Sequence, residues 1–305
     1  MEPPQPASRM RRPRAVISVA SNKGGVGKTT LATNLAIYLR ALHEDLPVLL
    51  LGLDDQTIID RMFCLSPSGG PEANLKHGWA ERSLSRVMRV GQFGIHYVPT
   101  PPDTGPLKTR AEDPGTLLRI LEQTDFEGVV IVDTKSDLEE LTRNALFAAD
   151  LVIVPVADRA SFDEAEKVFA LLEASGRGGA RRGRVLLTLV DRRTRVDRYG
   201  HDLHRQLAQA VDARGWPRFH AQISRSPRVE ALNSSAGAPG SVLHQARSTA
   251  VHRELRELAE EVTKLLDLSV GTAQRPPRAL APPPAPSAAG SLKGALLRGL
   301  RGRLS

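Results

Sequence analysis

Short runs of apolar residues recur along the chain, and longer stretches with apolar residues at helical spacing separate them. The runs are rich in valine, isoleucine and leucine, which is typical of strands buried on both faces of a sheet. They predict strands at residues 15–20, 48–53, 95–99, 129–133, 151–156, 184–190 and 219–223. The intervening stretches predict helices at residues 28–43, 117–123, 138–148, 161–174, 203–213 and 249–266. This alternation predicts an α/β fold: a doubly wound, mostly parallel sheet with helices on both faces.

Two segments carry more local signals. Ser161 and Glu164 have the spacing of a capping box, so we expect the helix there to begin at this serine. Residues 55–92 show no clear period, and the prolines and glycines between 67 and 71 indicate a turn. We therefore expect residues 55–92 to be irregular.

The two ends of the chain differ in composition from the predicted α/β domain, which we place at residues 14–267. Residues 1–13 are rich in proline and arginine, and residues 268–290 in proline and alanine, so we expect a disordered extension and a linker. Residues 291–305 form a basic tail with leucine at every fourth position. Three roles stay open for this tail: an amphipathic contact with a membrane, a contact with DNA or a partner, or none.

The composition narrows the class of protein. Of the 305 residues, 41% are hydrophobic, which is enough for a buried core. The single cysteine, Cys64, excludes an intrachain disulfide and a cysteine-only zinc site within one chain. No stretch reaches the roughly 18 apolar residues of a membrane span, and the N-terminal residues do not resemble a secretory signal. We therefore expect a cytoplasmic protein.

Positive charge is concentrated in one segment of the predicted domain. The net charge is +8, and residues 177–228 hold thirteen arginines and no lysine against four aspartates. Some of these arginines directly follow two successive predicted strands: Arg192, Arg193 and Arg195 follow the first, and Arg225 and Arg228 the second. If the strands are neighbours, both groups lie at one edge of the sheet and could bind the phosphate backbone of DNA without reading its sequence. The alternative is a solvated, salt-bridged surface.

The strongest chemical signal is a glycine-rich loop between the first predicted strand and the first predicted helix. It consists of Lys23, Gly24, Gly25, Val26, Gly27, Lys28, Thr29 and Thr30. Glycines allow such a loop to turn its amides toward phosphate groups, and the following helix N-terminus adds positive potential. Lys28 is expected to reach the β- and γ-phosphates, and the Thr29 hydroxyl to ligate Mg²⁺. The loop therefore predicts ATP and Mg²⁺ as cofactors.

The additional lysine at the start of this loop, Lys23, makes it resemble the ParA/MinD ATPases, the deviant Walker A group of P-loop proteins. Further segments are similar to motifs of that family in the same order: LLLGLDDQ at 49–56 (the switch), VVIVDT at 129–134 (Walker B), ALFAADLVIVPV at 145–156, LTLVDRRTR at 187–195 and ISRSPRVEA at 223–231. The resemblance extends over residues 14–266 and is closest to the ParA-type partition ATPases.

The resemblance implies roles for individual residues and for the whole chain. Lys23 would reach across a homodimer to the partner's phosphates, Asp54 would position the attacking water near the metal, and Asp133 would hold Mg²⁺ through a water. The ATP-bound dimer would bind non-specific DNA at the nucleoid and hydrolyse ATP slowly, stimulated by a ParB-like or adaptor protein. Its task would be to partition or position a chromosome, a plasmid or a large cargo.

The chain also departs from the family pattern near the metal. Gly52 replaces the first aspartate of the switch, Asp55 replaces a proline, and Lys135 and Ser136 replace two prolines after Walker B. Nucleotide binding should survive these changes, but the rate of hydrolysis depends on them more directly. These departures leave one alternative open, a nucleotide-dependent switch with little hydrolysis. The basic tail leaves a second one open, a MinD-like ATPase that works on a membrane surface.

Overall fold

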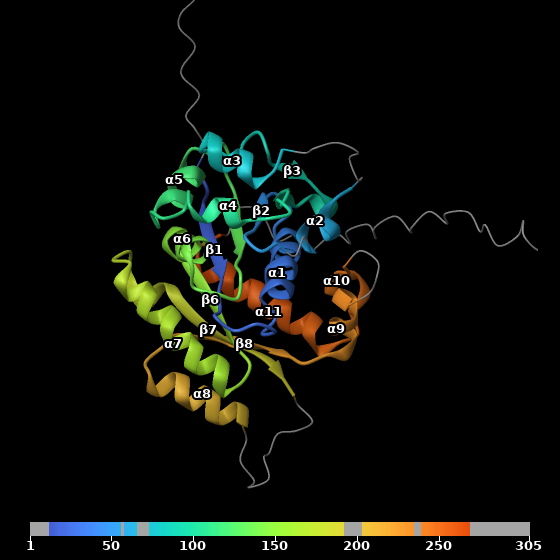
Figure 1. The fold of residues 1–305 in the computed structure, drawn as a ribbon. Helices are drawn as coiled ribbons and strands as arrows, with labels where there is room; N and C mark the ends of the chain where they lie inside the picture. Colours follow the sequence, from blue (N-terminus) through green and yellow to red (C-terminus); the bar gives the residue numbers. More distant parts are fainter. Residues whose placement is uncertain (1–11, 56–57, 66–72, 192–202, 235–238, 269–305) are drawn as a thin grey trace, which may run out of the picture.

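The computed structural model describes residues 12–55, 58–65, 73–191, 203–234 and 239–268, and they form an eight-stranded sheet (Figure 1). Its strands are β1 Ala15–Val19, β2 Val48–Gly52, β3 Arg89–Val90, β4 His96–Val98, β5 Val129–Asp133, β6 Leu151–Val156, β7 Gly183–Val190 and β8 Arg218–Ser224. The strand order is β3-β4-β2-β5-β1-β6-β7-β8, and only the β3–β4 pair is antiparallel. The predicted doubly wound, mostly parallel α/β fold is confirmed.

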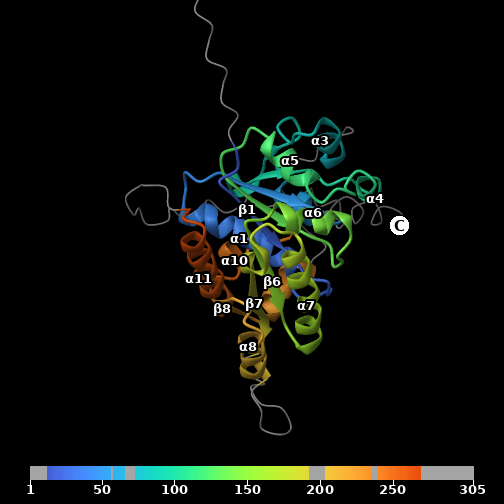
Figure 2. The ribbon, with the colours of Figure 1, turned by 90° about the vertical axis from the view of Figure 1, so that its left-hand side faces the viewer.

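Helices cover both faces of the sheet, as Figure 2 shows with α1 and α11 on one side of the strands and α6 and α7 on the other. Alternate residues of a strand serve the two faces: in β5, Ile131 packs with the core beneath α1 and α11, whereas Val130 and Val132 pack with the core beneath α5 and α6. The helices are α1 Lys28–Leu42, α2 Ile58–Phe63, α3 Leu75–Glu81, α4 Gly105–Lys108, α5 Thr116–Glu122, α6 Glu140–Ala148, α7 Arg159–Ala174, α8 Leu203–Ala213, α9 Pro227–Ser234, α10 Val242–Gln245 and α11 Ala250–Leu265. Among the described residues, no helix is both long and apolar enough to cross a membrane.

The carboxyl ends of the central strands form the edge at which a site is expected. In the sheet, β1 lies between β5 and β6, with β2 beyond β5 on one side and β7 beyond β6 on the other. The strand order therefore reverses at β1. In open α/β sheets, ligands bind outside the carboxyl ends of strands at such a reversal. The glycine-rich loop after β1 and Asp133 at the end of β5 both lie there.

Strand β8 forms one edge of the sheet, and α11 packs against it. The carboxylate of Glu261 accepts hydrogen bonds from the backbone amides of His220, at 3.0 and 3.1 Å, and Ala221, at 3.2 Å. The buried carboxylate of Glu254 accepts from the amide of Ser224 at 2.7 Å and from its hydroxyl at 2.6 Å. Three amides of this edge strand therefore donate to glutamates of a helix.

Two local expectations were wrong. Residues 55–92 contain the helices α2 and α3, because Ile59, Met62 and Phe63 bury one face of a turn too short to show a period. Helix α7 begins at Arg159 and not at Ser161: Asp158 is the N-cap, and Ser161 is the third helical residue. The Asp158 carboxylate accepts from the Ser161 amide at 2.8 Å, and the Asp158 amide donates to the Ser161 hydroxyl at 2.9 Å. The capping box thus lies three residues earlier than expected.

Candidate nucleotide-binding site

The glycine-rich loop leaves a hollow in front of the N-terminus of α1. Gly25 and Gly27 have φ values of +77° and +91°, which residues with a side chain rarely adopt. A Cβ atom added at either glycine would meet no atom within 4 Å, so open space faces the loop. No side chain caps α1, so its first backbone amides are available to an anion. A loop of this shape before a helix fits the phosphate groups of a nucleotide.

Lys28 begins α1 and is almost completely buried, with 7% of its surface exposed. Its Nζ donates to the carbonyl of Lys23 at 3.1 Å and to the Ser136 hydroxyl at 2.6 Å. Burial lowers the pKa of Lys28, although the nearby carboxylates of Asp133 and Asp54 act in the opposite direction. The predicted phosphate lysine therefore lies against the loop in a setting where an additional anion would favour its charged form.

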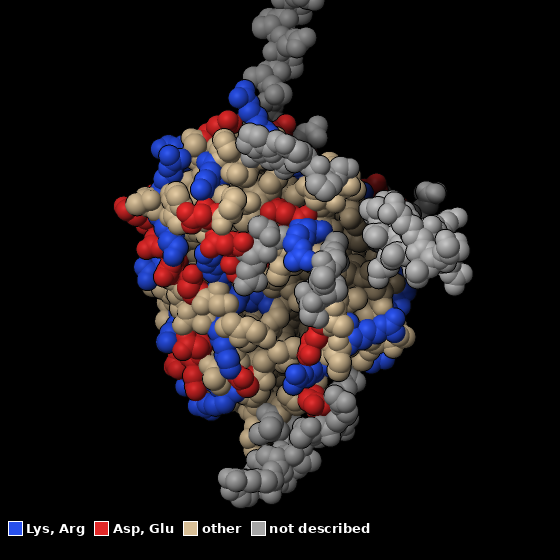
Figure 3. All heavy atoms as spheres, turned by 45° about the vertical axis from the view of Figure 1, so that its right-hand side comes forward, with Lys and Arg blue, Asp and Glu red and all other residues tan. Residues whose placement is uncertain are grey.

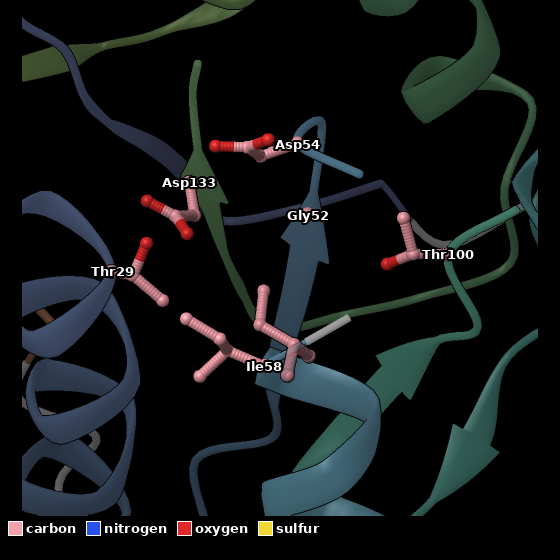
Figure 4. Close-up of a pocket in the computed structure, with 7 residues that line it drawn as sticks. Thr29, Gly52, Asp54, Ile58, Thr100 and Asp133 are labelled. Carbon is pink, nitrogen blue, oxygen red and sulfur yellow. The ribbon is translucent and has the colours of Figure 1, made fainter. Parts of the chain in front are cut away.

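The predicted metal-binding residues Thr29, Asp54 and Asp133 line one small pocket (Figure 4). Figure 4 shows the Thr29 hydroxyl and the Asp133 carboxylate pointing toward each other, with the carboxylate of Asp54 beside them. Asp133 is 2% exposed, and its Oδ1 has no hydrogen-bond partner among the described residues. Burial raises the pKa of Asp133 to about 7, although hydrogen bonding to Thr29 and the charge of Lys28 lower it. A buried carboxylate oxygen without a partner, beside a hydroxyl, fits the oxygen ligands that Mg²⁺ prefers.

Asp54 lies on the loop after β2, in the same pocket as Thr29 and Asp133. Burial raises the pKa of Asp54, and the charges of Lys135 and Lys28 counteract that rise. Lys135 itself forms an ion pair with Asp55, with 2.6 Å between Nζ and Oδ2. The sequence marked Asp55 and Lys135 as separate departures from the family pattern, and their contact across 80 residues carried no sequence signal.

The packing of α2 explains why a glycine ends β2. A Cβ atom at Gly52 would lie 2.9 Å from Cδ1 of Ile59 and 3.3 Å from Oγ1 of Thr100. Ile58 and Ile59 form the apolar wall of the pocket on this side. The position of the usual switch aspartate is therefore closed to a side chain unless Ile59 moves.

Lys23 lies outside this pocket, at the surface. Its Nζ is 2.6 Å from Oδ2 of Asp158, the N-cap of α7, and about a third of the side chain is exposed. Burial alone would raise the pKa of Asp158, but hydrogen bonds from Lys23 and Ser161 hold it below its usual range. In this single chain Lys23 is thus engaged by its own subunit, and its reach toward a second subunit stays a prediction.

A mostly apolar pocket, which the sequence did not predict, lies directly beside the phosphate loop. Val26, Gly27 and Thr30 form its side toward the loop. The opposite wall comes from the ends of β7 and β8 and from α11, with Leu189, Ile223 and Leu255 among its residues. Leu189 has a φ of +54°, an uncommon conformation for a branched side chain and one that occurs preferentially at functional sites.

The basic segment divides into residues that serve the fold and residues that face solvent. Arg177 and Arg182 donate to carbonyls at the end of α6, and Arg214 and Arg218 form ion pairs with Glu166 and Asp212. Of the predicted DNA-binding residues, Arg225 pairs with Glu230 at 3.0 Å, and Arg228 donates to the Ser248 hydroxyl at 2.9 Å. Arg192, Arg193 and Arg195 lie outside the described residues. On the face drawn in Figure 3, basic and acidic side chains are interspersed over much of the surface.

The parallel sheet, the glycine-rich loop and the buried acid at the end of β5 together define a P-loop nucleotide-binding protein. Comparison with known proteins specifies the family. The family model for the CobQ/CobB/MinD/ParA nucleotide-binding domain matches residues 17–236, and this chain belongs to that family. Its sequence is 30% identical over 264 residues to the chromosome-partitioning ATPase Soj of Thermus thermophilus, covering 81% of this chain and 94% of Soj.

Solved structures that share the fold include two with a bound ATP analogue. One is a plasmid partition protein from Borrelia burgdorferi bound to AMPPNP, with a TM-score of 0.63 and 18% identity, covering 84% of this chain and all of that chain. The other is a cobyrinic acid a,c-diamide synthase from Mycobacterium smegmatis bound to an ATP analogue and magnesium. It has a TM-score of 0.58 and 23% identity, covering 87% of this chain and 99% of that chain.

Proposed function

We propose that this chain is a ParA-type ATPase that binds Mg·ATP at residues 23–30 and forms a homodimer in that state. The observation that carries the proposal is the open hollow at Gly25 and Gly27 beside the buried Lys28. Near that lysine, one oxygen of Asp133 has no hydrogen-bond partner among the described residues. Lys28 and the loop amides would hold the phosphates, Thr29 and Asp133 the metal, and Asp54 the attacking water. When bound, Mg²⁺ supplies charge neutralisation for phosphoryl transfer.

The apolar pocket beside the loop is the proposed site of the nucleotide base. It is contiguous with the phosphate loop through Gly27 and Thr30, and its apolar walls suit the faces of an aromatic base. Its place at the ends of β7 and β8 also connects the base with the segment that leads to Arg225 and Arg228. A bound base would thus contact residues next to the proposed DNA-binding surface.

The proposed biological role is partitioning or positioning of a chromosome, plasmid or large cargo. The support is the similarity over most of both chains to a protein named as a chromosome-partitioning ATPase. Non-specific DNA would be the surface to which the dimer binds, and a ParB-like or adaptor protein would stimulate slow hydrolysis. A cytoplasmic, nucleoid-associated location follows from that role.

The test measures nucleotide binding and the oligomeric state of the same set of variants. Lys28→Ala removes the cation at the loop, and we expect it to abolish binding of a fluorescent ATP analogue. Lys23→Ala should retain nucleotide binding in the monomer but fail to dimerise with a non-hydrolysable analogue and Mg²⁺ in light scattering. Lys264→Ala, which changes an exposed lysine near the end of α11, is the matched control and should behave like the unchanged protein. Tight ATP binding by the Lys28 variant, or an unchanged protein that stays monomeric, would contradict the proposal.

One observation favours a second candidate, a nucleotide-dependent switch with little turnover. At Gly52 the switch lacks its first carboxylate, and Ile59 fills the adjacent space. A metal site with fewer carboxylates would hold Mg²⁺ less firmly, and Mg²⁺ is the group that would neutralise charge on the phosphates in the transition state. Dimerisation with ATP but no phosphate release, even with DNA present, would favour this candidate. The MinD-like alternative depends on residues 291–305, which lie outside the described residues.

A further inference from the structure

Two residues that depart from the ParA pattern are partners of each other in this fold. Lys135, after β5, and Asp55, after β2, form an ion pair of 2.6 Å in which the side chains are 20% and 39% exposed. The other carboxylate oxygen of Asp55, Oδ1, accepts from the backbone amide of Thr104 at 2.9 Å. One carboxylate therefore joins three loops, those after β2, β4 and β5.

These contacts restrain the backbone on both sides of Asp54. On its N-terminal side, the amide of Leu53 donates to the carbonyl of Asp133 at 2.9 Å. On its C-terminal side, Asp55 is held by Lys135 and by the amide of Thr104. The residue proposed to orient the attacking water thus lies between two fixed neighbours.

The same loop also contacts the phosphate lysine. Ser136, the residue after Lys135, accepts a hydrogen bond from Nζ of Lys28 at 2.6 Å. A continuous series of contacts therefore connects the phosphate loop with the loop that bears Asp54, through two adjacent residues of the segment after β5. The usual prolines at positions 135 and 136 could make neither contact, because proline has no polar side chain.

We propose that Lys135 is a positioning residue for ATP hydrolysis: through its ion pair with Asp55 it fixes the loop that places Asp54 beside the γ-phosphate. The proposal rests on the proposed function. It also explains why Lys135 and Asp55, which both depart from the ParA pattern, occur together. Each is partly buried, and its charge is compensated by that of the other.

A purely electrostatic role for Lys135 predicts a different result. Lys135 is positive and Asp55 is negative, so removing each charge would shift ATP affinity in opposite directions if both acted on the phosphates through space. Positioning instead requires the pair, so loss of either member should have the same effect. A misplaced reacting group of this kind costs on the order of tenfold to a hundredfold in rate.

The experiment measures single-turnover and steady-state ATP hydrolysis for Lys135→Ala, Asp55→Asn and the double variant. We expect both single variants to lower kcat about tenfold with little change in KM, and the double variant to be no slower than the slower single. Lys135→Arg, which retains the charge, should restore most of kcat. The matched control is Lys108→Ala, which removes a partly exposed lysine at the end of α4 that forms an ion pair with Glu139, the N-cap of α6.

Amide hydrogen exchange of the nucleotide-free protein gives a second readout without catalysis. Protection around residues 53–55 should fall in Lys135→Ala and Asp55→Asn but not in Lys108→Ala. Unchanged kcat in both single variants, or opposite shifts in KM with an additive double variant, would overturn the positioning role and leave the proposed function standing. Absence of hydrolysis in the unchanged protein would overturn the proposed function and, with it, this role in hydrolysis.

Discussion

At the scale of single residues, the site depends on charges held away from water. Lys28 and Asp133 are almost completely buried. Burial lowers the pKa of Lys28 and raises the pKa of Asp133, so it favours the uncharged form of each. A Mg·nucleotide complex carries both signs of charge and so stabilises the ionised forms of both residues. The arrangement therefore favours a ligand with a metal and phosphates over either one alone.

Asp133→Asn should change stability in a pH-dependent way. Because the folded pKa, about 7, is above the unfolded value of 3.8, the folded chain holds a proton that the unfolded chain has lost between these values. The stability of the nucleotide-free protein therefore falls through this residue as pH rises from about 4 to 7. We expect the unfolding free energy of the variant to exceed that of the unchanged protein by on the order of 4 kcal/mol at pH 8 and by little near pH 4.

Urea denaturation of the nucleotide-free protein at several pH values measures this difference. The control is Asp45→Asn, because Asp45 is exposed and distant from the site. A stability difference that stays constant between pH 4 and 8 would contradict a raised pKa of Asp133 in the folded protein.

At the scale of elements, the sequence predicts long buried strands well and short or contact-dependent elements poorly. β5 and β6 are continuous apolar runs, so their bounds matched, whereas β3 has two residues and depends on its pairing with β4. The phosphate loop could be predicted because its residues are consecutive. The Lys135–Asp55 pair could not, since it depends on two loops that only the sheet order brings together. The apolar pocket beside the phosphate loop was missed for the same reason.

The contact between β2 and α2 gives a prediction at this scale. Gly52→Ala places a methyl group 2.9 Å from Cδ1 of Ile59, so we expect a loss of roughly 1–3 kcal/mol in unfolding free energy. Ile59→Val removes that Cδ1 atom. In an Ile59→Val background, Gly52→Ala should therefore cost less than it does alone.

Thermal and chemical denaturation of the two singles and the double measure this coupling. Gly24→Ala serves as the control for stability, because its Cβ would meet nothing closer than the Ser136 hydroxyl at 3.8 Å. Strict additivity of Gly52→Ala and Ile59→Val would rule out the contact as the reason for glycine at this position.

At the scale of the whole molecule, the arginines of the basic segment have different surroundings. The arginines around α6, α7 and α8 bond to carbonyls and acids of the same chain, so much of the basic segment supports the fold. Arg225 and Arg228 follow β8, close to the proposed base pocket. Arg225 and Arg228 are thus the described members of the predicted DNA-binding set, and their side chains also contact Glu230 and Ser248 of the same chain.

Replacing Arg225 and Arg228 together by alanine should weaken DNA binding by the ATP-bound protein and reduce its dependence on salt. Each lost phosphate contact lowers the slope of log affinity against log salt by about 0.9. Arg214→Ala with Arg218→Ala, which removes two ion-paired arginines, is the control with the same change in net charge. Fluorescence anisotropy over a salt series measures both slopes. Equal losses of DNA affinity in the two double variants would show that Arg225 and Arg228 act only through the net charge of the protein.

The glutamates of α11 have a consequence for how copies of this chain can assemble. An open strand edge is a template on which a second chain adds a strand, and such addition leads to fibres and aggregates. Along β8, carboxylates already occupy the amides of His220, Ala221 and Ser224. At the opposite edge, β3 offers only two residues. Growth of the sheet from molecule to molecule is thus disfavoured at both margins, which directs self-association to surfaces built from helices and loops.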